Sequence, residues 1–217
     1  MSHVVPAGSS PAPALWPSVA MIAGGSLNIA LWPIYTILHG PGSVDQERDF
    51  LGMGSLFWGS MTEGPSGMLI ALGLVGSYGR LTAGGGRLAR VGYVLTMIGV
   101  VIPALINVSI LAVMPPLLAP VFGGGLILIA LASRRSASLT RFSRLVLYGL
   151  GTVLLWSFLW LLAVRPQVLD QIYGYRIYGA VANVFFGVGW ILFGLNLATR
   201  DRRADTCAAP VAATPGA

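Results

Sequence analysis

Long apolar stretches separated by short loops constrain this 217-residue chain more than any other feature. Hydrophobic residues make up 55% of the sequence and charged residues 9%, whereas a typical soluble domain has about 25% charged residues. Inside a bilayer, helices satisfy all their backbone hydrogen bonds internally. The sequence therefore predicts an all-α fold, a polytopic integral membrane helix bundle in the cell (inner) membrane.

The expected bundle has about six transmembrane helices in one domain, residues 15–200. About 20 residues are needed to cross the hydrocarbon core, because a helix rises about 1.5 Å per residue. The flanking segments 1–14 and 201–217 are poor in large apolar residues and are predicted to be disordered. The expected spans are about 15–38, 51–79, 91–113, 117–132, 145–164 and 177–197.

Arginine placement predicts the orientation of the bundle. All thirteen basic residues are arginine, and ten of them fall in the loop 80–90, the loop 134–144 and the C-terminal tail. The positive-inside rule then places both termini and these loops in the cytoplasm. Such clusters suit anionic lipid headgroups, so the net charge of +6 is not read as a sign of nucleic-acid binding.

Glu63 is the one acid inside an apolar stretch of spanning length. A carboxylate in hydrocarbon is costly, so such a residue usually faces a bundle interior and has a function. Ser55, Gly59 and Gly67 share its helix face at four-residue spacing, and three small residues on one face favour close helix packing. Because desolvation disfavours the ionised form, we expect the protonated form of Glu63 to predominate at neutral pH.

Pro65 lies two residues after Glu63 and removes a helical hydrogen bond to Met61. A straight helix over residues 51–79 would be about 43 Å long, more than the bilayer core requires. We therefore expect a kink or break near residues 61–66. In the alternative interpretation, residues 50–64 lie at the membrane interface and Glu63 is solvated.

Further candidate site residues lie toward the outer half of the expected bundle. Asparagines inside three spans are candidates to hydrogen-bond Glu63 or to line a pocket, although helix-to-helix hydrogen bonds are an equally ordinary role for them. Aromatic residues on the same side are candidates to wall an apolar pocket, although most such residues belong to interfacial belts. The candidate second carboxylates are Asp49 and Asp170, and the candidate substrate-binding residues are Asn28, Trp58, Asn107, Trp156, Tyr173 and Asn183.

Several kinds of site are excluded by composition. The single cysteine, Cys207, forms neither an internal disulfide nor a cysteine metal cluster, and two histidines do not make a histidine-rich metal or haem site. The acidic loop that starts at Asp45 lacks the glycine and the final glutamate of an EF-hand. We therefore expect no metal and no cofactor.

These residues lead to three functional hypotheses. The first is a membrane-embedded enzyme that uses Glu63 as a general acid on a lipophilic, isoprenoid-like molecule taken from the bilayer. The second is a small proton-coupled transporter or exporter, possibly a homo-oligomer, in which Glu63 carries the proton. The third is an accessory or immunity-type membrane protein without a catalytic site.

Overall fold

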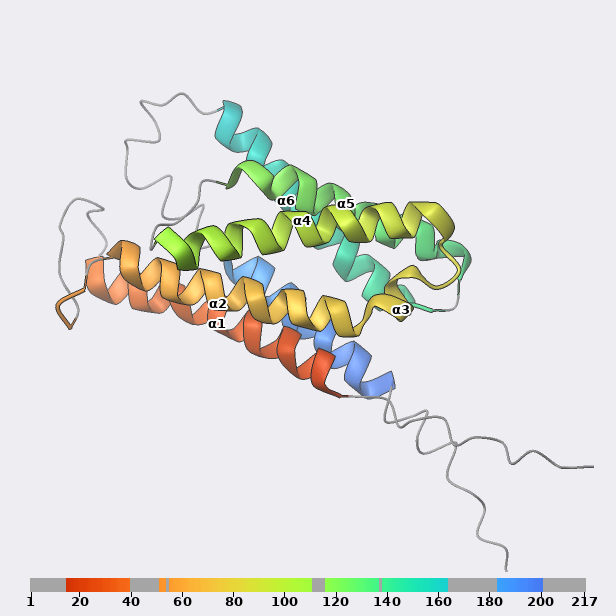
Figure 1. The fold of residues 1–217 in the computed structure, drawn as a ribbon, viewed down its shortest axis with the longest axis horizontal. Coiled ribbons are helices and arrows are strands. Elements are labelled where there is room, and N and C mark those ends of the chain that lie inside the picture. Colours follow the sequence, from red (N-terminus) through yellow and green to blue (C-terminus); the bar gives the residue numbers. More distant parts are fainter. Residues whose placement is uncertain are drawn as a thin grey trace, which may run out of the picture.

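The computed structural model describes residues 15–39, 51–53, 55–110, 116–136, 138–163 and 183–200, and every long element in them is a helix. The all-α prediction is confirmed (Figure 1). Residues 183–200 are helical and are called the C-terminal helix. The other elements are α1 (Trp16–His39), α2 (Ser55–Gly76), α3 (Tyr78–Thr82), α4 (Gly86–Ile110), the 3-10 turn η1 (Pro116–Leu118), α5 (Ala119–Ala132), the 3-10 turn η2 (Ser133–Arg135) and α6 (Arg141–Ala163).

The helices follow the expected spans but extend into the basic segments. Helix α1 matches the expected 15–38 closely, whereas α4 begins at Gly86 instead of 91 and α6 at Arg141 instead of 145. The C-terminal helix continues to residue 200 instead of 197. The segments 1–14 and 201–217, expected to be disordered, lie outside the described residues.

Helix α2 runs without a break from Ser55 to Gly76, with Pro65 inside it. Of the expected kink or break near residues 61–66, the break is therefore wrong, and a kink at Pro65 stays a prediction. Proline removes one hydrogen bond, and packing on both sides holds the helix together here. The Ser66 hydroxyl donates to the Gly24 carbonyl of α1 at 2.7 Å. On the other side, a Cβ at Gly64 would lie 2.4 Å from Val108 of α4, so the helices are in close contact there.

Each long helix packs antiparallel against the next, and the last packs against the first (Figure 1). Glycines lie at several of these contacts. A Cβ on Gly25 of α1 would lie 2.5 Å from the carbonyl oxygen of Gly187, and a Cβ on Gly187 would lie 2.5 Å from that of Gly25. Gly123 of α5 and Gly151 of α6 approach each other's carbonyls in the same way, at 2.6 Å. Small residues at helix contacts are typical of packing inside membranes.

The closed ring is α1–α2–α4–α5–α6–C-terminal helix, and its apolar core lies toward the end that carries α3. Ile70 and Leu74 of α2, Leu126 of α5 and Leu147 of α6 are fully buried there. Trp190 and Phe193 of the C-terminal helix complete this core. The core thus fills the half of the ring next to α3, η2 and the segments that carry arginine, at residues 80–90, 134–144 and 200. We call this end of the bundle the basic end.

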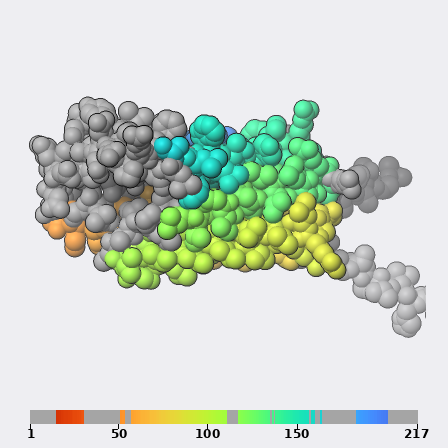
Figure 2. Space-filling model, turned by 90° about the horizontal axis from the view of Figure 1, so that it is seen from above, coloured from red at the N-terminus to blue at the C-terminus, as the bar shows by residue number. Residues whose placement is uncertain are grey.

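Helix α4 has the reverse of a soluble helix pattern. Its buried side is made of small and polar residues, namely Ala89, Gly92, Thr96, Gly99, Val100, Ala104 and Asn107. Its exposed side carries large apolar residues along its length, namely Leu88, Val91, Val94, Ile98, Ile102 and Leu105. In Figure 2 its surface runs from yellow to light green along one edge of the molecule. Within the described residues, α4 is the one helix long and apolar enough by itself to cross a membrane, and α5 is a shorter apolar helix.

Candidate functional site

Glu63 of α2 and Asn107 of α4 meet across the interface of these two helices. The Asn107 side-chain amide donates a hydrogen bond to Glu63 Oε2, with an Nδ2–Oε2 distance of 3.5 Å. This distance is long for a hydrogen bond, so the contact is a weak one. Asn107 is buried and Glu63 is partly buried. The sequence named both residues, and the structure brings them together.

Close backbone packing fixes this pair. One helical turn from Glu63, a Cβ on Gly67 would lie 2.8 Å from the Ala104 side chain of α4. A Cβ on the neighbouring Gly64 would clash with Val108. The absence of side chains at Gly64 and Gly67 therefore lets α4 approach closely enough for Asn107 to reach the carboxyl group.

Further polar groups surround Glu63 on α2. Ser60 is fully buried, and Thr62 is buried and donates to the carbonyl oxygens of Trp58 (2.8 Å) and Gly59 (3.0 Å). Ser66 bonds to α1, as described above. Sequence analysis missed these hydroxyl residues as part of the site. They lie within three residues of Glu63 in the sequence, and this proximity could have identified them as its neighbours.

The polar residues occupy a different level of the bundle from the apolar core. Glu63 lies 13 residues before the end of α2 at Gly76, which corresponds to a height of roughly 20 Å above the basic end. Trp190 lies ten residues before residue 200, at roughly 15 Å. Fully buried apolar side chains thus lie at the level of Trp190 and below, whereas Glu63, Thr62 and Asn107 lie above it.

An aromatic cluster closes the bundle between these two levels. Trp190 stacks on Phe122 of α5 with a 6.2 Å centroid distance and makes edge contacts with Phe186 (5.9 Å) and Phe193 (6.0 Å). Trp190 is fully buried, and its Nε1 has no hydrogen-bond partner within the described part of the chain. The sequence did not predict this cluster, because hydropathy does not show which helices are neighbours.

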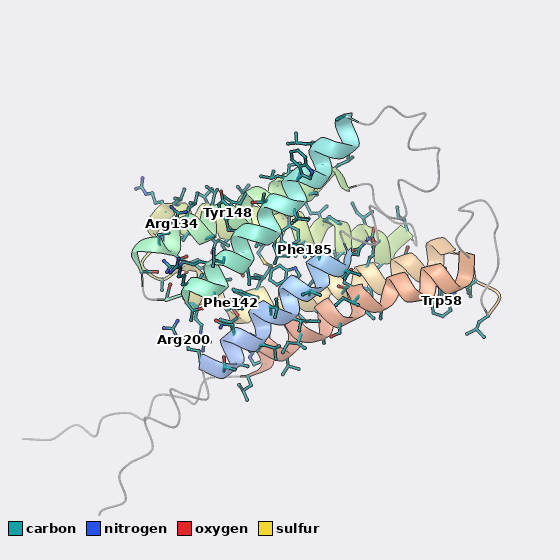
Figure 3. All side chains as sticks on the ribbon, turned by 180° about the vertical axis from the view of Figure 1, so that it is seen from behind. Trp58, Arg134, Phe142, Tyr148, Phe185 and Arg200 are labelled. Atoms are coloured by element: carbon teal, nitrogen blue, oxygen red, sulfur yellow. The ribbon has the colours of Figure 1, made fainter. Side chains whose placement is uncertain are left out.

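The remaining candidates are dispersed. Asn28 is buried on α1, one helical turn beyond Gly24, which faces α2. Trp58 lies at the far end of α2 and makes an edge contact with Phe57 at 5.5 Å (Figure 3). Asn183 is partly buried at the start of the described C-terminal helix. Trp156 of α6 is 67% exposed, as a residue on the outer surface of the bundle would be.

Three candidates, Asp49, Asp170 and Tyr173, lie outside the described residues. The structure thus supports one acid with an amide partner and leaves the two proposed second carboxylates untested. Among the residues that the structure does describe, no group of three His, Cys, Asp or Glu is placed to hold a metal ion.

Comparison with known proteins adds no family. The chain matches no protein-family model, no curated protein and no solved structure. The geometry around Glu63 is therefore the main indication of function.

Proposed function

We propose that the chain is a multi-pass membrane protein with its basic end in the cytoplasm. The observation that carries this is the reversed pattern of α4, with small and polar residues inside and large apolar residues outside. The C-terminal helix supports it, since Phe185, Val188, Leu192 and Leu195 are exposed on it. An exposed apolar surface along a whole helix suits lipid and not water.

Charge placement supports the same proposal. Of the described side chains, the ionised arginines lie at the basic end, and Glu63 is the single acid. Its partner is a neutral amide, Asn107. An acid among apolar helices and without a cation beside it in the described residues suits the protonated, neutral form.

We further propose that the protein is an enzyme in which Glu63 acts as a general acid on a lipophilic, isoprenoid-like molecule. The carboxyl group supplies the proton, and the Asn107 amide orients it. The hydroxyl-rich turns around Thr62 and Ser66 fix the backbone that holds the acid. General acids contribute typically 10²- to 10⁴-fold to a rate.

The filled core is compatible with catalysis on a substrate that is taken from the bilayer. Below Glu63 the ring is closed by fully buried side chains, with Trp190 stacked on Phe122. This arrangement suits a site that a membrane-dissolved substrate reaches from the lipid.

The test is turnover by the purified full chain in detergent and in nanodiscs, with a panel of polyprenyl and other apolar lipids and product analysis by mass spectrometry. Glu63→Gln keeps the shape of the side chain and removes the acid, so turnover should fall at least a hundredfold. Ser109→Ala, on the exposed side of α4 two residues from Asn107, is the matched control and should retain full activity.

A different result would point to another class. If product forms equally with Glu63→Gln, the assigned role is wrong. If no lipid is converted but proteoliposomes show solute flux that needs a pH gradient and Glu63, the protein is a proton-coupled transporter. A silent Glu63→Gln in both assays would indicate an accessory protein.

A further inference from the structure

Four arginines at the basic end have exposed side chains and make no hydrogen bond through their guanidinium groups in the part of the chain that the structure describes. We call them the arginine collar: Arg87 and Arg90 of α4, Arg134 of η2 and Arg141 of α6. Arg144 differs from them, because its Nη1 donates to the carbonyl oxygens of Ser133 (3.4 Å) and Arg134 (3.2 Å). The collar arginines therefore keep their donors available for a ligand.

Contacts between loops bring the segments that carry the collar, which are distant in sequence, to one end of the bundle. The Ser138 hydroxyl donates to the Ala83 carbonyl at 3.3 Å, which joins the α5–α6 loop to the α3–α4 loop. The Ser138 carbonyl accepts a hydrogen bond from Arg200 at the end of the C-terminal helix. Figure 3 shows Arg134, Phe142 and Arg200 at this one end of the bundle, with Trp58 at the opposite end.

Among the described residues, no acidic side chain lies at the basic end to compensate the positive charge of the collar. Glu63, at the other level of the bundle, is the single acid among the described residues. Arg87, Arg90 and Arg141 also lie in or next to the first turns of α4 and α6, where the helix dipole disfavours cations. Nearby anions from outside the chain would relieve both sources of repulsion.

Large apolar side chains adjoin the collar. Leu88 follows Arg87, Val91 follows Arg90, and Phe142 follows Arg141, and these three are 47%, 52% and 45% exposed. An anion that carries an acyl chain satisfies both kinds of neighbour, whereas a soluble phosphate or a nucleic acid contacts only the guanidinium groups. Clustered arginine next to a membrane is attracted to acidic lipids.

We propose that the arginine collar binds the phosphate groups of acidic phospholipids at the bilayer surface. This inference rests on the membrane placement proposed above and does not depend on the chemistry of Glu63. Guanidinium groups bind phosphate oxygens in a bidentate manner, so each collar arginine can hold a headgroup phosphate while the exposed apolar residue beside it contacts the acyl chain.

The experiment measures the affinity of the detergent-solubilised full chain for short-chain phosphatidylglycerol, phosphatidylcholine and inorganic phosphate. We expect phosphatidylglycerol to bind at least tenfold more tightly than either of the other two. Each arginine near a membrane surface contributes on the order of fivefold, so the triple variant Arg87→Gln, Arg134→Gln, Arg141→Gln should weaken binding by on the order of a hundredfold.

Single variants provide the matched control. Arg134→Gln should weaken phosphatidylglycerol binding by about fivefold. Arg144→Gln removes the same charge from a guanidinium that is already bonded to two carbonyls, so it should lower the melting temperature and change lipid affinity less than Arg134→Gln does. Glu63→Gln should bind phosphatidylglycerol normally, which separates this proposal from that of catalysis.

Equal affinity for phosphatidylcholine, or equal affinity for inorganic phosphate, would overturn the proposal. These comparisons use the unmodified chain, so they decide the question even if the triple variant does not fold. Equal losses in Arg134→Gln and Arg144→Gln would show diffuse charge attraction and would also overturn a defined headgroup site.

Discussion

The side-chain amide of Asn107 reaches the carboxyl group of Glu63 from the neighbouring helix, at 3.5 Å. Because this distance is long, the energetic coupling between the two residues should be small. A double-mutant cycle with Glu63→Leu and Asn107→Leu, both of which remove the hydrogen bond, should give about 0.6 kcal/mol, the average for side-chain hydrogen bonds between membrane helices. The measurement is reversible unfolding of the full chain in mixed micelles.

The control cycle pairs Glu63→Leu with Ser109→Ala, and Ser109 lies on the exposed side of α4. Its coupling should be zero within error. A coupling above about 2 kcal/mol for Glu63 with Asn107 would show a much shorter, stronger contact than the structure contains.

Adjacent glycines on α5 should respond in opposite ways to the same substitution. A methyl group on Gly123 would lie 2.6 Å from the Gly151 carbonyl oxygen of α6, whereas Gly124 has no atom within 4 Å of its Cβ position. Gly123→Ala should therefore destabilise the protein by about 1–3 kcal/mol. Gly124→Ala should leave it unchanged or stabilise it by up to about 1 kcal/mol. Thermal or micellar unfolding compares the two, and equal effects would contradict the described α5–α6 contact.

Asn196 links the C-terminal helix to the start of α6 by hydrogen bonds. Its Oδ1 accepts hydrogen bonds from Thr140 Oγ1 and Ser143 Oγ, both at 2.7 Å. Asn196→Ala leaves two hydroxyl groups without this acceptor and should cost about 1–3 kcal/mol of unfolding free energy. Thr199→Ala removes only an exposed hydroxyl that bonds to its own helix, so its cost should be below about 0.5 kcal/mol. A Thr199 effect as large as that of Asn196 would contradict the assigned contact.

The proposed topology predicts the side on which inserted reporters lie. Helix α3 and η2 lie at the same end of the bundle (Figure 1), so reporters inserted after Thr82 and after Ser138 should both score cytoplasmic. A reporter between residues 40 and 50, after α1 ends at His39, should score external. Opposite scores for the first two sites would contradict the fold itself, and a reversal of all three would contradict only the orientation.

Hydropathy predicted the helices well but not where they begin and end. It locates the apolar part of each span, whereas the backbone hydrogen bonds of α4 and α6 continue into arginines at Arg87 and Arg141. Arginine is a good helix former, so charge ends the apolar span without ending the helix. Pro65 was misread for a related reason. The loss of one backbone hydrogen bond at Pro65 predicted a break or a kink. Contacts from α1 and α4 keep the helix continuous there.

The site was predictable in part. A single acid in an apolar stretch is easily recognised in the sequence, and Asn107 was one of three asparagines proposed as its partner. The choice of Asn107 over Asn183 follows from the packing of α2 on α4, and hydropathy carries no information on which helices are neighbours. The Trp190 cluster was hidden for the same reason, since Phe122 and Trp190 are far apart in sequence and meet only when the ring closes.

The reciprocal contact between Gly25 and Gly187 makes the first and last described helices direct neighbours. The packing of the helices in the ring therefore does not depend on which of them comes first in the sequence. Gly194 also packs on the Ser18 carbonyl. The first turn of α1 and the last turns of the C-terminal helix therefore lie close together at the basic end. A circularly permuted gene that joins them and opens the chain at another loop should therefore encode the same assembled bundle, because the contacts that hold it do not depend on where translation starts.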